Sequence, residues 1–166
     1  MELKLEAQIY AETFDMVRNL SKFYFSNLGD IDVHKCIEIG GKKFNSPYWI
    51  AAHLTWTEHS LLIEAMGREL MNIPWLEKFS IGTEPPDGDD LPTFSEILKT
   101  MEVVHNTAMN YLKSMTDAEL DEPNAFNFSF GGVNSKRSII KHCIRHEPMH
   151  IGQLSWYLKI NNVEMP

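Results

Sequence analysis

Three histidines near the end of the chain recur at every fourth residue, in the segment SIIKHCIRHEPMHIGQLSWYL at residues 138–158. They are His142, His146 and His150. An α-helix turns about 100° per residue, so successive members of this series lie about 40° apart on one face. Apolar residues share or flank this face, which predicts that it is buried. Several buried imidazoles need partners, and a shared metal ion is a common one, so the series predicts a metal site.

His146 and His150, at positions i and i+4, are spaced to bind one metal ion from a single helix. A third ligand must then come from a neighbouring helix, and His53 is the natural donor because it lies on the inward face of the predicted second helix. Three neutral imidazoles with coordination positions left open to water are typical of catalytic sites. Such a site favours Lewis-acid chemistry, or a lowered pKa of a bound water or thiol.

The identity of the metal is less constrained by these residues than its position. Imidazole ligands suit zinc, nickel, iron or copper and do not discriminate among them. We expect a divalent transition metal, zinc first, with nickel, iron and manganese also open.

Several residues beside the predicted ligands are candidates for supporting roles. Gln153 lies one turn beyond His150 and could hydrogen-bond a ligand or a bound water. His142 could replace or support a ligand, whereas His105 lies in the apolar stripe of the predicted third helix and is expected to be a core or supporting histidine. Glu147 points about 100° away from His146, which predicts a supporting or surface role.

Pro148 lies between the two predicted ligands of the last helix. A proline there removes the hydrogen bond to the carbonyl of Ile144 and should kink the helix. Two interpretations stay open: the kink is merely tolerated, or it re-aims His150.

A rival constellation consists of two ExxH pairs, Glu102 with His105 and Glu147 with His150. Two such pairs, with two further glutamates, form the di-iron carboxylate site of ferritin-like bundles. Glu102 lies about 100° from the centre of its apolar stripe, and the inward position of the second helix is taken by His53. The three-histidine site is therefore the favoured interpretation.

Four amphipathic helices are predicted to position these residues. Ser46 and Pro47 start the second helix, and Thr93 with Glu96 forms a capping box at the start of the third. Residues 73–92 hold four prolines and form a long connection. Shorter features are an extended piece at residues 36–39 and one helical turn near residues 116–119. The helices are predicted at residues 6–28, 46–70, 93–115 and 135–159, which indicates an all-α four-helix bundle with a long connection between helices 2 and 3.

In the loop at residues 124–134, phenylalanines alternate with polar residues, and two glycines follow the last phenylalanine. This pattern predicts an extended loop. One interpretation is that Phe128 and Phe130, with Trp56 of the second helix, form the rim of a substrate pocket. An equally strong interpretation is a flap that covers one end of the core.

The composition narrows the class of protein and of partner. With 166 residues, the chain is expected to form one domain, residues 1–166. A formal net charge of −8 argues against nucleic-acid binding and favours small-molecule partners. Cys36 and Cys143 are too few and too isolated for a disulfide framework, which suits a reducing cytosol. No apolar run approaches the roughly 18 residues of a membrane span, and the N-terminus lacks the apolar core of a signal peptide, so we expect a cytoplasmic protein.

The stretches SPYWIAAHLTWTEHSLL and HEPMHIGQL together resemble the DinB/YfiT-like superfamily. The resemblance covers nearly the whole chain and implies a DinB-like four-helix bundle. It implies that His53, His146 and His150 hold the metal, and Gly152-Gln153 matches the usual continuation of the motif. Pro148 departs from the residues more usual between the two histidines.

Members of that superfamily with an assigned activity are mostly thiol-dependent. They join low-molecular-weight thiols such as bacillithiol or glutathione to electrophiles, or isomerise a substrate with mycothiol. The DNA-damage name of the group refers to induction and not to DNA binding. The resemblance therefore implies a metal-dependent thiol S-transferase with a low-molecular-weight thiol as cosubstrate.

Two other classes of function stay open. One is a metal-dependent hydrolase that uses metal-bound water. The other is a non-catalytic, stress-induced metal-binding or dimerisation module, including a homodimer through an outer helix face. A fourth protein ligand, for instance His105 or His142, would favour a structural metal, whereas an open pocket beside three ligands would favour an enzyme.

Overall fold

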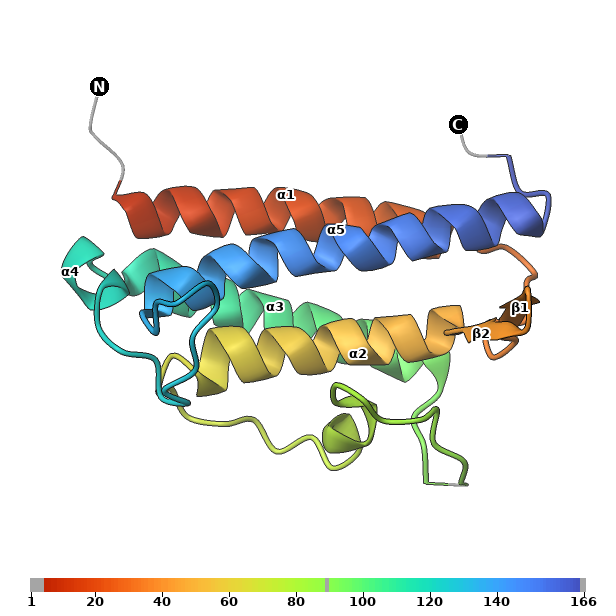
Figure 1. Cartoon of the computed structure of the whole chain (residues 1–166), viewed down its shortest axis with the longest axis horizontal. Helices are drawn as coiled ribbons and strands as arrows, with labels where there is room; N and C mark the ends of the chain where they lie inside the picture. Colours follow the sequence, from red (N-terminus) through yellow and green to blue (C-terminus); the bar gives the residue numbers. More distant parts are fainter. Residues whose placement is uncertain (1–4, 89, 165–166) are drawn as a thin grey trace.

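The computed structural model describes residues 5–88 and 90–164, and four long helices dominate it (Figure 1). Residues 1–4 lie outside the described residues. They belong to the N-terminal segment that the sequence analysis expects not to be a signal peptide. Helices α1 and α5 lie side by side along one edge of the molecule, with α2 and α3 alongside them. The prediction of an all-α fold is confirmed. The long helices are α1 (Glu6–Ser26), α2 (Pro47–His59), α3 (Phe94–Ser114) and α5 (Lys136–Ile160).

Side-chain caps set the starts of three of these helices, as their sequences predict. Ser46 accepts a hydrogen bond from the Trp49 N–H in front of α2, and Ser135 caps α5 in the same way. Thr93 and Glu96 form both bonds of a capping box at the start of α3. The short helix α4 (Asp117–Leu120) begins with another capping box and confirms the predicted helical turn.

The second helix ends differently from its prediction. Regular α-helix stops at His59 and continues as one π-helical turn, η1 (Ser60–Glu64). Gly67 then takes a φ of 73°, and the Arg68 N–H bonds back to the carbonyl of Ile63. This is a helix C-terminus in which a left-handed glycine reverses the chain, so the helix cannot extend to residue 70.

Two segments between the long helices contain structure that the sequence indicates only in part. Strands β1 (Ile37–Ile39) and β2 (Lys42–Phe44) form an antiparallel hairpin, of which only the first strand is predicted. The long connection before α3 contains a 3₁₀ turn, η2 (Leu76–Phe79), which places Phe79 in the core with no exposed surface.

Asn124 organises the aromatic loop that precedes α5. Its side chain is buried, donates to the carbonyls of Phe128 and Asn134, and accepts the N–H groups of Phe126 and Phe128. These four bonds, together with the bond from the Asn124 N–H to the carbonyl of Asn134, fix the conformation of the loop. In the described part of the chain, no helix is long and apolar enough to cross a bilayer.

Candidate metal centre

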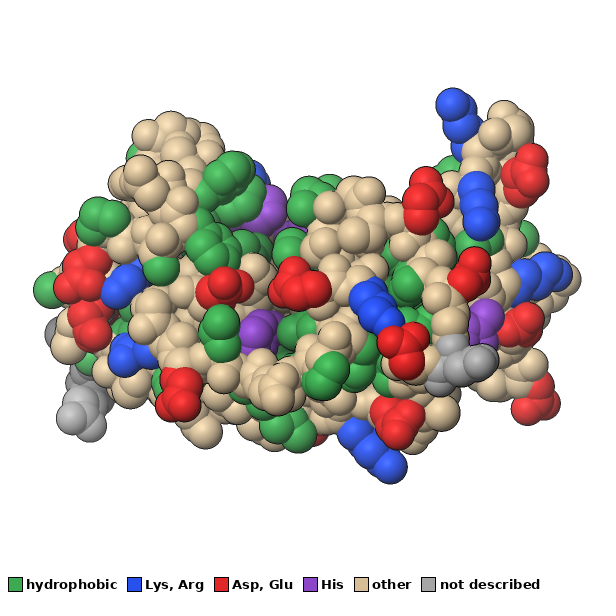
Figure 2. Space-filling view, turned by 90° about the horizontal axis from the view of Figure 1, so that it is seen from below, with side chains coloured by type: hydrophobic (Ala, Val, Ile, Leu, Met, Phe, Trp, Pro, Cys, Tyr) green, Lys and Arg blue, Asp and Glu red, His purple; other side chains and the backbone are tan. Residues whose placement is uncertain are grey.

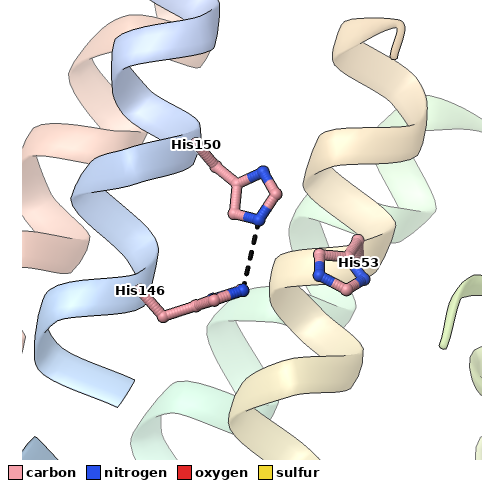
Figure 3. A group of neighbouring side chains, drawn as sticks. All are labelled: His53, His146 and His150. Carbon is pink, nitrogen blue, oxygen red and sulfur yellow. Dashed lines mark hydrogen bonds between the residues drawn. The ribbon is translucent and has the colours of Figure 1, made fainter. Parts of the chain in front are cut away.

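His53 from α2 and His146 and His150 from α5 point into the space between these two helices (Figure 3). Each offers a ring nitrogen, and these nitrogens lie within 4.8 Å of one another. The Nε2 atoms of His146 and His150 are 3.3 Å apart. Two imidazoles bound to one tetrahedral zinc ion, with bonds of about 2.0–2.1 Å, would have their nitrogens about 3.4 Å apart. The group therefore has the donor type and the spacing to hold a metal ion.

Hydrogen bonds on the far side of two rings direct the lone pairs of their Nε2 atoms towards the cluster. The Nδ1–H of His53 donates to the carbonyl of Phe79 at 2.8 Å. The Nδ1–H of His150 donates to Oε1 of Gln153 at 3.0 Å. A neutral imidazole with its proton on Nδ1 carries its lone pair on Nε2, so both rings present a ligand atom to the cluster.

Aromatic rings hold His53 in place. Its imidazole is stacked between Trp49, with ring centroids 4.5 Å apart, and Trp56, with centroids 5.7 Å apart. The indole N–H of Trp56 donates to the carboxylate of Glu77, which anchors the outer ring of the stack. The side chain of His53 therefore has little freedom to turn away from the cluster.

The three rings are held in the neutral form that metal binding requires. Burial lowers the pKa of His53 to about 4. Burial, together with the neighbouring histidines, lowers the pKa of His146 to about 3. Burial also lowers the pKa of His150, although the bond to Gln153 opposes this. Protons therefore do not compete with a metal ion for these nitrogens near neutral pH.

A cavity of about 540 Å³ opens beside the cluster and has His53 and His146 in its wall. The structure brings Trp56, Phe128 and Phe130 together along the same cavity. On the face shown in Figure 2, a histidine side chain is exposed at the bottom of a hollow, and hydrophobic side chains lie around its edge. The cavity thus joins the candidate ligands to a mainly apolar space large enough for a small molecule.

The structure also places the predicted supporting residues. Gln153 contacts His150 as described above, and His142 lies one turn before His146, with ring centroids 5.6 Å apart. Burial and the nearby charge of Arg145 lower the pKa of His142. His105 lies elsewhere in the core, and its ring nitrogens contact carboxylates of α1 and α2 rather than the cluster.

A buried ionic network that the sequence analysis did not predict joins α1 to α2 and α5. Arg18 of α1 has no exposed surface and pairs with Glu58 of α2 at 2.7 Å and with Glu147 of α5 at 2.9 Å. Ser21 also donates to Glu147, and His105 contacts Glu58 at 2.8 Å. The surface alternative for Glu147 is therefore wrong: Glu147 is buried and faces α1, about 100° round the helix from its neighbour His146. Arg18 follows Phe14 by one turn on the inward face of α1. That spacing is the sequence signal from which the burial of Arg18 could have been predicted.

The rival di-iron constellation does not form a single site. Glu102 is about half exposed and pairs with Lys22 on the surface. Glu147 is directed to Arg18 rather than to His150. The carboxylates of the two ExxH pairs therefore lie apart, each satisfied by a basic side chain.

A model of the DinB superfamily matches residues 13–154, which include all three histidines of the cluster. The chain belongs to the DinB superfamily. No curated protein gives a significant match to it. Membership of the DinB superfamily and the three-histidine cluster of α2 and α5 together support the interpretation that this protein binds a metal ion.

Proposed function

We propose that this DinB-superfamily protein is a metal-dependent enzyme that transfers a low-molecular-weight thiol to a small electrophile. His53, His146 and His150 hold one divalent transition metal ion, with zinc as the first candidate. The observation that carries the proposal is the position of two members of this cluster, His53 and His146, in the wall of a 540 Å³ cavity. Three protein ligands leave coordination positions for a substrate, and the cavity leads to them.

The bound ion would lower the pKa of a coordinating thiol, so that the nucleophilic anion exists near neutral pH. The protein's own residues supply the surroundings of that chemistry. Phe79 and Gln153 orient two of the ligand rings through their Nδ1–H groups. Trp56, Phe128 and Phe130 provide apolar walls that exclude water from the reacting groups and contact the electrophile.

The proposal is tested on zinc-reconstituted protein, with a panel of low-molecular-weight thiols (glutathione, bacillithiol, cysteine) and small aromatic electrophiles. We expect conjugate formation that requires both the thiol and the metal. The variant His53→Ala should lose this activity, whereas His34→Ala should retain it, because His34 is exposed and stacks on Tyr48 away from the cluster.

Two outcomes would replace the transferase proposal. Hydrolysis of aryl esters without thiol, lost in His53→Ala, would identify a metal-dependent hydrolase. Metal binding with no turnover of either substrate class would favour the non-catalytic metal-binding module.

A further inference from the structure

His142 lies in the wall of the cavity but outside the three-histidine cluster. Its ring stacks on Phe130, with centroids 3.6 Å apart and planes 6° from parallel. Its Nδ1 receives two N–H bonds from Arg145, at 3.3 Å from Nε and 3.0 Å from Nη2. The ring is thus fixed on one face by an aromatic side chain and at one nitrogen by a guanidinium.

The contact with Arg145 determines which ring nitrogen of His142 carries the proton. A guanidinium only donates hydrogen bonds, so Nδ1 must be the acceptor and must lack a proton. The proton of the neutral ring is therefore on Nε2. That nitrogen bonds to no residue in the described part of the chain, so its N–H is available to a ligand.

The other polar side chains of the cavity wall are already engaged or buried: Nδ1 of His146, which has no hydrogen-bond partner within residues 5–88 and 90–164, is not accessible from the cavity. In the metal-free protein the hydroxyl of Thr57 donates to Nε2 of His53 at 3.4 Å, and that of Ser60 donates to Glu64 at 3.4 Å. The indole N–H of Trp56 donates to Glu77. Among the described residues that line the cavity there is no Lys, Arg, Asp or Glu. A wall of this kind suits a neutral, mainly apolar molecule, and a single accessible unused side-chain donor among its described residues selects for an acceptor atom.

We infer that His142 determines specificity in this cavity by donating its Nε2–H to an acceptor oxygen of a neutral, mainly apolar substrate, such as an aromatic aldehyde or ketone. The inference rests on the proposed function in so far as it takes the cavity to be the substrate site. Arg145 is the positioning residue that keeps the proton on Nε2, and Phe130 keeps the ring in the wall. The carboxylate groups of a thiol cosubstrate would then lie outside this cavity, because no Lys or Arg is among the described residues of its wall.

The first test measures ligand preference in metal-free protein, with two probes that differ only in a carbonyl group. Acetophenone and ethylbenzene are titrated, and binding is followed by tryptophan fluorescence and by NMR shifts. We expect wild-type protein to bind acetophenone more tightly than ethylbenzene by roughly three- to tenfold, the value of one hydrogen bond. His142→Phe preserves stacking on Phe130 and should abolish this preference while leaving ethylbenzene affinity unchanged. The matched control, His34→Phe, should keep it.

The second test measures the tautomer directly, by NMR of protein labelled with ¹⁵N in its histidine rings. We expect the His142 signals of an unprotonated Nδ1 and a protonated Nε2, and a mixture of tautomers in Arg145→Met. The Arg145→Met protein retains His142 and keeps the test valid if His142→Phe does not fold.

Equal preference in wild type and His142→Phe, no binding of acetophenone, or a proton on Nδ1 of His142 would each overturn the inference. Neither test uses the metal or turnover. A failure of the inference is therefore distinct from a failure of the transferase proposal, which depends on conjugate formation by the zinc-loaded protein.

Discussion

At the scale of single residues, the orientation of His150 depends on the side chain of Gln153. In Gln153→Leu the Nδ1–H of His150 loses its acceptor, so we expect zinc affinity to fall about 10- to 100-fold. Gln153→Glu keeps an acceptor oxygen and should bind zinc at least as tightly as wild type. Competition with a chromophoric chelator measures both affinities. Wild-type affinity in Gln153→Leu would show that this bond does not orient the ligand.

Burial of His53 makes the stability of the metal-free protein depend on pH. The pKa of His53 is about 4 in the folded state and 6.5 as its ordinary value. Above pH 6.5 the ring is neutral in both states, and below it the unfolded chain takes up the proton first. Stability is therefore lost as the pH falls from 6.5 towards 4, by roughly 3 kcal/mol from this group.

Urea unfolding in the presence of a chelator, repeated across this pH range, checks the prediction. The variant His53→Gln cannot take up that proton, so its free energy of unfolding should fall less steeply with acid than that of wild type. Removing His53 also relieves part of the lowering of the His146 pKa, which changes the acid dependence in the same direction. Identical slopes would mean that His53 is not held neutral by burial.

The four-residue spacing of the histidines is enough to predict one face of α5, and with it two rings of the cluster. It does not reveal the groups that orient those rings when they come from irregular chain. Phe79, whose carbonyl accepts from His53, lies in a 3₁₀ turn of the long connection, where no periodicity indicates which groups face inward. Glu147 shows a second limit, because a helix between two neighbours buries more than one face.

At the scale of elements, Arg18 connects α1 to α2 and α5 from a fully buried position. In Arg18→Met the carboxylates of Glu58 and Glu147 stay buried without their cation. We expect the free energy of unfolding to fall by about 3–5 kcal/mol, as when one partner of a buried ion pair is removed. Urea denaturation followed by circular dichroism measures the change.

The matched control for Arg18 is the exposed pair between Lys22 of the same helix and Glu102 of α3. Lys22→Met should change stability by no more than about 1 kcal/mol, because solvent screens that pair. Equal losses in the two variants would contradict a stabilising role for the buried network.

Helix starts were more predictable than helix ends in this chain. Caps such as Ser46 and Thr93 act through local hydrogen bonds that a short sequence pattern encodes. After α2 the chain continues as a π-helical turn, whose formation depends on packing rather than on a local sequence pattern. Gly67, which ends the helical segment, is followed by further apolar residues, so the sequence does not show clearly that the helix stops there. Strand β2 has three exposed residues, so no burial pattern indicates it.

At the scale of the whole molecule, a metal ion would link α2 to α5. A ligand that binds only the folded state stabilises it by about 2.7 kcal/mol at 100 times its Kd. We therefore expect the melting temperature of wild type to rise with zinc concentration. His146→Ala should show no such rise, and His105→Gln should show it from a lower starting value, because His105 is buried outside the cluster. Calorimetry on the three proteins measures these shifts.

The central claim is that His53, His146 and His150 form one metal centre, and metal content tests it most directly. Plasma mass spectrometry is applied to protein purified without an affinity tag, together with His53→Ala and His150→Ala. The claim predicts one equivalent of a transition metal in wild type, lost in both variants while their helical circular dichroism is retained. Two irons per chain, or a metal content that neither substitution lowers, would contradict it.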